Sequence, residues 1–98
     1  LSCLTRYFEI EPGGVSSLER HLHPHSVVVL RGEGRVRLGR ESHPIGPFDC
    51  VYVSPDTVHQ FQATGEEPLG FLCVVDRHRD RPVDVAPGAT DGEEATRS

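Results

Sequence analysis

Proline and glycine are spaced so closely along this chain that long helices are excluded. Ten glycines and eight prolines are distributed over 98 residues, and no helical pattern longer than about two turns survives between them. Short Val-rich segments separated by turn signals are typical of a β-sandwich or a β-barrel. The length suits one modest hydrophobic core and is too short for two. We therefore expect a single all-β domain.

Several segments have the composition or the alternation of short β-strands. In the first of them, Arg6, Phe8 and Ile10 fall on one face, as in a half-buried strand. The stretch between Leu38 and Cys50 is assigned no strand. The predicted strands are Thr5–Glu11, Ser17–His23, Val27–Leu30, Arg35–Leu38, Cys50–Val53, Val58–Ala63 and Leu69–Asp76.

The end of the chain differs in composition from the rest. Residues 80–98 include many charged and small residues and few large apolar ones, so they bury too little surface to offset the entropy of ordering. We expect a barrel domain over residues 1–79 and a C-terminal tail over residues 80–98 that is flexible or draped over the barrel.

Charge and hydropathy argue against two classes of partner. The net charge is −5, and the ten basic residues are all arginines, scattered among carboxylates. A nucleic-acid backbone needs a basic stripe, and a membrane span needs about 20 apolar residues, and the sequence has neither. Cys3, Cys50 and Cys73 follow neither a zinc-ribbon nor a disulfide spacing. We expect a cytoplasmic protein that binds neither nucleic acid nor membrane.

Three of the six histidines lie within five residues, and a fourth lies on a later predicted strand. His21 and His23 alternate, so in a strand their imidazoles share one face. In a straight strand His25 would lie roughly 13 Å from His21, which is too far for one ion. A bend at Pro24, where a strand ladder is interrupted, could bring His25 to the same ion. Together with His59, the pattern predicts a transition-metal site with three or four histidine ligands.

Two stretches of the chain resemble the two motifs of the cupin superfamily. The first motif has a Gly-rich start, a His-x-His pair, a third ligand and a closing glycine, which here are Gly13-Gly14, His21-Leu22-His23, His25 and Gly32. The second has a glycine, a short strand, a proline turn and a histidine, which here are Gly46, Val51-Tyr52-Val53, Pro55 and His59. The match covers about Arg6 to Asp76. Within the superfamily, the chain is most similar to small single-domain bacterial cupins with four histidines. It implies a jelly-roll barrel, also called a double-stranded β-helix.

Two positions depart from the cupin pattern. The third ligand in cupins is usually a glutamate, whereas this chain has His25, with only Pro24 between it and the preceding pair. Glu19 is the alternative ligand. Asp56 stands where the second motif usually has glycine, and aspartate tolerates a left-handed backbone better than most residues, so the turn can survive.

The resemblance implies one divalent transition metal per chain, with Mn or Fe favoured and Ni, Cu or Zn also able to occupy the site. Neutral histidines keep the full charge of the ion, which favours anionic or enolisable oxygen ligands and leaves positions open to water or dioxygen. His43 and His78 stand apart from this group and are expected to be surface residues.

The wall of a ligand pocket can be predicted from alternation. Phe61 shares a face with His59, and Phe71 shares one with Cys73, which suggests an apolar barrel mouth. For Cys73 itself, a small buried hydrophobe is the favoured interpretation. Arg6 is the candidate contact for an anionic substrate, and its alternative is a solvent-exposed strand end.

The leading functional hypothesis is a metal-dependent oxygenase or a related redox enzyme acting on a small organic substrate. A metal-dependent isomerase or lyase and a non-catalytic ligand-binding module are the alternatives, because one barrel hosts many activities. Cupin barrels have exposed sheet edges that a second copy can cover. Thr5–Glu11 is the expected edge, and we predict a homodimer.

Overall fold

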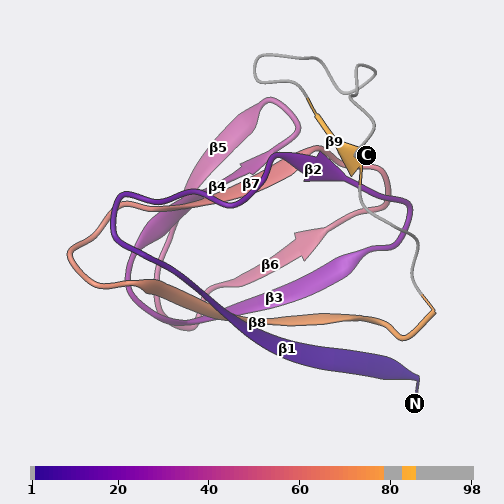
Figure 1. Ribbon diagram of the computed structural model, residues 1–98, viewed down its shortest axis with the longest axis horizontal. Coiled ribbons are helices and arrows are strands. Elements are labelled where there is room, and N and C mark those ends of the chain that lie inside the picture. Colours follow the sequence, from indigo (N-terminus) through magenta and orange to yellow (C-terminus); the bar gives the residue numbers. More distant parts are fainter. Residues whose placement is uncertain (1, 79–82, 86–98) are drawn as a thin grey trace.

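The computed structural model describes residues 2–78 and 83–85 and consists of two β-sheets that face each other (Figure 1). The all-β prediction is confirmed for these residues. None of the described segments is a helix of the length and apolarity needed to span a membrane. The strands are β1 (Cys3–Ile10), β2 (Glu19–Arg20), β3 (His25–Arg31), β4 (Gly34–Leu38), β5 (Glu41–Ile45), β6 (Cys50–Val53), β7 (His59–Ala63), β8 (Leu69–Asp76) and β9 (Val83–Asp84).

Strands distant in sequence are neighbours in both sheets. One sheet has the order β1-β8-β3-β6 and the other the order β5-β4-β7-β2-β9, and all pairings are antiparallel. β1 pairs with β8 over its whole length, from Cys3 opposite Asp76 to Ile10 opposite Leu69. β1 therefore lies at a sheet edge, as predicted, while β8 and β3 occupy the centre of the same sheet.

The hydrophobic core fills the space between the two sheets. Its most deeply buried members include Val27 and Val29 of β3, Val36 of β4 and Leu69 of β8. In β4, β6 and β7 alternate residues are buried in this layer, which is why their apolar positions recur with a period of two. The burial of these side chains is the main force that holds the sheets together.

One turn between the sheets requires glycine. Gly32, between β3 and β4, has a positive φ of 76°, a conformation that side-chain-bearing residues rarely adopt. A Cβ atom at this position would also overlap the carbonyl oxygen of Pro68. The turn can therefore pack against the start of β8 only if residue 32 lacks a side chain.

The structure differs from the predicted strands most clearly in two places. β5 was not predicted, because only Ile45 of its five residues is buried and no apolar alternation marks it. It is an edge strand, where Pro44 is tolerated. The predicted strand Ser17–His23 is reduced to the two residues of β2, because the chain leaves the sheet before His21.

The predicted tail, residues 80–98, lies outside the described residues except for Val83–Val85. There β9 pairs with β2, with Glu19 opposite Asp84. Val85 is buried in a small second cluster with Leu18 and Val58. Among the described residues, β9 is thus the edge strand of the second sheet, next to β2.

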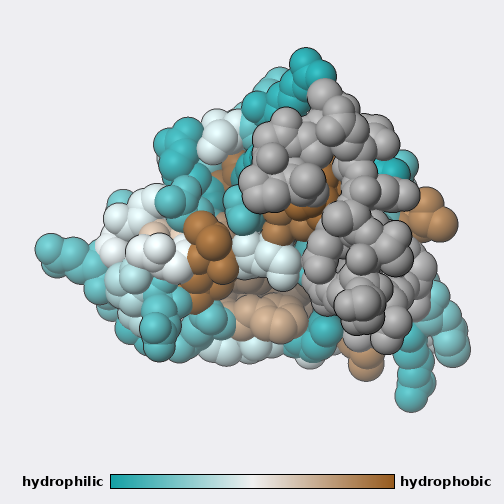
Figure 2. Space-filling model, turned by 45° about the horizontal axis from the view of Figure 1, so that its top comes forward, coloured by the Kyte–Doolittle hydropathy of each residue, from teal (hydrophilic) through white to brown (hydrophobic). Residues whose placement is uncertain are grey.

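Exposed apolar side chains are scattered on the face shown in Figure 2, where the described residues form several separate brown patches among teal ones. The most exposed large apolar residue is Phe48, at 79%, and Leu22 and Tyr52 are also exposed. Exposed apolar side chains are common on protein surfaces.

Candidate metal centre

Three of the four predicted histidine ligands converge on one point. His21 follows β2, His25 begins β3 and His59 begins β7, and one ring nitrogen from each lies within 4.8 Å of the others. His21 and His59 are only 3% and 4% exposed. Three nitrogens at this spacing could hold one metal ion.

A bend in the chain brings His21 and His25 together. The prediction that His21 and His23 alternate along a strand was wrong, since the backbone bends at Leu22 and His23 instead. The bend expected at Pro24 is thus present just before it, and it removes the separation of roughly 13 Å that a straight strand would impose. As a result the ring centroids of His21 and His25 are 4.3 Å apart.

Backbone carbonyls fix the orientation of two of these rings. Nδ1 of His21 donates a hydrogen bond to the carbonyl oxygen of His23 at 2.7 Å, and Nδ1 of His59 donates one to that of Thr57 at 2.8 Å. A carbonyl can only accept, so each ring carries its hydrogen on Nδ1 and keeps the lone pair on Nε2. Such a partner on the far nitrogen is the usual arrangement for a metal-ligating histidine.

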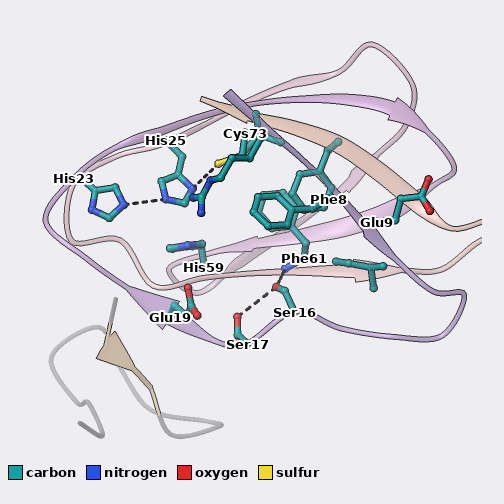
Figure 3. A pocket seen from close by; sticks show the side chains of 14 residues that line it. Phe8, Glu9, Ser16, Ser17, Glu19, His23, His25, His59, Phe61 and Cys73 are labelled. Carbon is teal, nitrogen blue, oxygen red and sulfur yellow. Dashed lines mark hydrogen bonds between the residues drawn. The ribbon is translucent and has the colours of Figure 1, made fainter. Parts of the chain in front are cut away.

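A thiol takes the place of the carbonyl at His25. Its Nδ1 lies 3.3 Å from Sγ of Cys73, and its Nε2 lies 3.3 Å from Nε2 of His23, as the dashed lines in Figure 3 show. When Nε2 of His25 serves as a metal ligand, Nδ1 carries the hydrogen and donates to sulfur. His23, the fourth predicted ligand, stacks on His21 with centroids 3.8 Å apart and therefore lies beside the three-nitrogen group.

The cluster favours neutral imidazoles. Burial, with added repulsion from the neighbouring histidines and Arg6, lowers the pKa of His25 to about 3. Burial also lowers the pKa of His59, although its hydrogen bond to Thr57 and the nearby Glu19 carboxylate oppose the change. Both rings are thus deprotonated at neutral pH, which is the form that binds metal.

The loop that carries His21 is tied to the turn that precedes His59. Arg20 forms an ion pair with Asp56 at 3.4 Å, and the backbone N–H of Asp56 donates to the carbonyl oxygen of His21 at 2.7 Å. Asp56 has a φ of 62°, which agrees with the prediction that aspartate would accept a left-handed conformation at this position. These contacts link the two segments that supply the histidines.

A cavity of about 370 Å³ adjoins the histidines, and Figure 3 shows the side chains of His25, His59 and Cys73 close together in it. All four residues predicted as substrate contacts, Arg6, Phe61, Phe71 and Cys73, line it. The rings of Phe61 and Phe71 stack at 4.7 Å and form an apolar wall. Nε of Arg6 is buried and has no hydrogen-bond partner among the described residues, so it is available to an anionic ligand.

Glu19, the alternative ligand, also lines the cavity. It pairs with His59 across β2 and β7 but is not a member of the three-nitrogen group. The sequence interpretation did not single out Ser16, whose Oγ accepts a hydrogen bond from the N–H of Phe61 at 2.8 Å. No local pattern marks such a contact, because the partners are 45 residues apart.

The donor set fits a divalent transition metal. Imidazole nitrogens suit Zn, Cu, Fe and Ni, whereas Mg and Ca prefer oxygen ligands, which the three-nitrogen group does not contain. His43, predicted to be a surface residue, lies on β5, is exposed and contacts Glu41 at 3.3 Å. His43 can therefore serve as a control histidine that lies outside the metal site.

This chain is similar in sequence to curated proteins. A curated protein of Rhodospirillum rubrum, 1-methylthio-D-xylulose 5-phosphate methylsulfurylase, is 48% identical over 77 residues, which cover 79% of this chain and 49% of the relative. The chain therefore spans about half the length of that relative.

Solved structures share the fold. A cupin 2 domain-containing protein from Halorhodospira halophila has a TM-score of 0.85 at 52% identity, covering 88% of this chain and 60% of the other. A cupin 2 conserved barrel domain protein from Rhodopseudomonas palustris has a TM-score of 0.84 at 45% identity, with 88% and 59% covered. The Cupin domain family matches residues 6–75. On these grounds, and with a two-sheet all-β fold and a histidine cluster at the motif positions, this chain belongs to the cupin family.

Proposed function

We propose that this chain is the metal-binding domain of an enzyme that acts on a small anionic substrate with a carbonyl group. The observation that carries the proposal is the convergence of three histidine nitrogens within 4.8 Å, beside a cavity that Arg6 also lines. Mn or Fe is the proposed metal, and Ni, Cu or Zn would also bind. One ion held by His21, His25 and His59 would supply Lewis-acid activation of a carbonyl oxygen.

The name of the Rhodospirillum rubrum relative suggests a more specific substrate, a phosphorylated ketose that carries a methylthio group. Two features of the cavity support the same class here. The guanidinium of Arg6 is suited to phosphate oxygens, which it can contact with two donors. The stacked rings of Phe61 and Phe71 offer an apolar surface on which a thioether sulfur makes favourable contacts.

An oxygenase is the second candidate, since three nitrogen ligands leave coordination positions for dioxygen. Cys73 favours the non-oxidative reaction. Its Sγ lies 3.3 Å from Nδ1 of His25, and a thiol beside an oxygen-activating metal is prone to oxidation. We therefore place Lewis-acid chemistry before oxygen chemistry.

The test is an anaerobic assay of the full chain loaded with Mn(II) or Fe(II). The probe is 1-methylthio-D-xylulose 5-phosphate with dithiothreitol present, and substrate loss is followed by mass spectrometry. We expect turnover without oxygen. Arg6→Gln should raise KM for the phosphorylated substrate about tenfold or more, and much less for its dephosphorylated analogue, because a charge-assisted contact to phosphate is lost.

Three other outcomes would contradict the proposal. Turnover only when oxygen is admitted would favour the oxygenase. Stoichiometric metal binding with no turnover under either atmosphere would favour a non-catalytic binding module. An equal effect of Arg6→Gln on both substrates would remove Arg6 from the phosphate site. His43→Ala is the matched control and should leave turnover unchanged, because His43 lies on an exposed edge strand.

A further inference from the structure

We infer that Cys73 accepts the methylsulfanyl group from the substrate and carries it as a mixed disulfide. The inference rests on the proposed function and adds the residue that receives the sulfur. Its basis is the position of the thiol in the cavity, its contact with His25 and the presence of Arg6 beside it in the sheet.

Cys73 lies in the middle of the sheet, with its side chain turned into the cavity. It belongs to β8, where it pairs with Arg6 of β1 on one side and Val27 of β3 on the other. Directly paired residues in a sheet have side chains on the same face. Arg6, Cys73 and Val27 therefore form one row, and all three line the cavity. A substrate anchored by Arg6 through an anionic group would lie directly over the sulfur.

The other two cysteines lack this placement. Cys50 is exposed on β6. Cys3 is the first residue of β1, three positions before Arg6. Neither lines this cavity. Cys73 is only 2% exposed, so bulk reagents reach it poorly, whereas a small molecule that enters the cavity meets it directly.

The partner of His25 points to a chemical role for the sulfur. Nδ1 of His21 and Nδ1 of His59 donate to backbone carbonyls, which orient the rings and are chemically inert. Nδ1 of His25 contacts Sγ of Cys73 instead (Figure 3). A sulfur in this place fixes the ring and also puts a nucleophilic atom at the edge of the three-nitrogen group.

The proposed step balances as follows. Sγ of Cys73 attacks the thioether sulfur of the substrate and forms an S–S bond, while the bond between that sulfur and C1 breaks. Its electron pair passes to the substrate as an enolate, and the proton of the thiol ends on C1. The cysteine sulfur is oxidised to the disulfide level and C1 is reduced. A low-molecular-weight thiol then attacks the methylsulfanyl sulfur, leaves as a methyl disulfide and returns the proton to Cys73.

The experiment uses the metal-loaded full chain under anaerobic conditions. Without added thiol, one equivalent of 1-methylthio-D-xylulose 5-phosphate should add about 46 Da to the protein, the mass of a methylsulfanyl group replacing hydrogen. Peptide mapping should place the adduct on Cys73, and one equivalent of the 1-deoxy sugar phosphate should appear with it. Dithiothreitol should remove the adduct and start multiple turnovers.

Variants provide a second measurement. Cys73→Ser and Cys73→Ala should form neither adduct nor product, whereas the matched variant Cys50→Ser should form both. Metal content is measured for each variant, and normal metal content with no adduct is the expected result for the Cys73 variants.

The outcomes separate this inference from the proposed function. Turnover with dithiothreitol, but without an adduct or a single-equivalent burst in its absence, would overturn the role of Cys73 and leave the proposed function in place. An adduct that maps to Cys3 or Cys50 would do the same. No turnover with dithiothreitol would overturn the proposed function, and the inference with it.

Discussion

The substitution His59→Ala tests the candidate metal centre at the ligand farthest along the chain from the other two. It removes one of the three nitrogens and leaves His21 and His25 in place. A ligand at about 100 times its Kd stabilises a folded protein by about 2.7 kcal/mol. In a domain of this size each kcal/mol changes Tm by about 4–8 °C. Metal at that concentration should therefore raise the Tm of the unsubstituted chain by about 11–22 °C.

The variant should lose this increase and should also be less stable without metal. The imidazole of His59 is buried and donates to the carbonyl oxygen of Thr57. Its removal leaves that carbonyl without this donor, which costs about 1–3 kcal/mol when the group is buried. Thermal melts with and without MnCl2, together with elemental analysis, measure both effects. We expect about one ion per chain before substitution and almost none after it.

The matched control for this experiment is His43→Ala. His43 is an exposed histidine outside the cluster, so its removal should change neither metal content nor the metal-dependent rise in Tm. The reasoning is refuted if His59→Ala still binds one ion and shows the full rise, or if His43→Ala abolishes it. In either case the ion would be bound somewhere other than the three-nitrogen group.

Three further predictions concern the barrel. Gly32→Ala should lower the free energy of unfolding by more than about 1 kcal/mol, since it combines a positive φ with overlap on Pro68; Gly13→Ala, with a similar φ and open space, is the control, and an equal loss at both sites in urea titrations would contradict the overlap argument. The metal-free protein should become less stable as pH falls from 7.5 to 5. The pKa of His25 is about 3 when folded and near 6.5 when unfolded, so the unfolded state binds more protons in this range; a reduced slope in His25→Gln would support this, and an unchanged slope would not. Sedimentation should give a homodimer, since β1 is an open edge, and a monomer at all accessible concentrations would refute this.

The sequence predicted those features of the fold that depend on local pattern. β8 has the predicted bounds, Leu69–Asp76, because a central strand buried between neighbours is almost continuously apolar. β5 was missed because an edge strand that buries only Ile45 has no such pattern. β2 is shorter than predicted because the bend after it cannot be read from alternation.

The candidate site also has one part that the sequence predicted and one part that it did not. The histidine group was predictable because three of its members are close in the sequence. The contact between His25 and Cys73 joins residues 48 positions apart, and it exists only because β3 and β8 are paired. Without knowledge of that pairing, the sequence favoured Cys73 as a small buried hydrophobe and gave no sign of its contact with a ligand.

The arrangement of His21, His23 and His25 within five residues has a consequence for the unfolded protein. These imidazoles stay close together even when the barrel is lost, so a denatured or newly synthesised chain can chelate a metal ion before His59 is in place. Metal bound in this way stabilises the unfolded state and subtracts from the stabilisation of the folded one. A growing chain can thus acquire its ion early and complete the ligand set when β7 joins the sheet. The ion would then already be bound to the chain when the barrel folds.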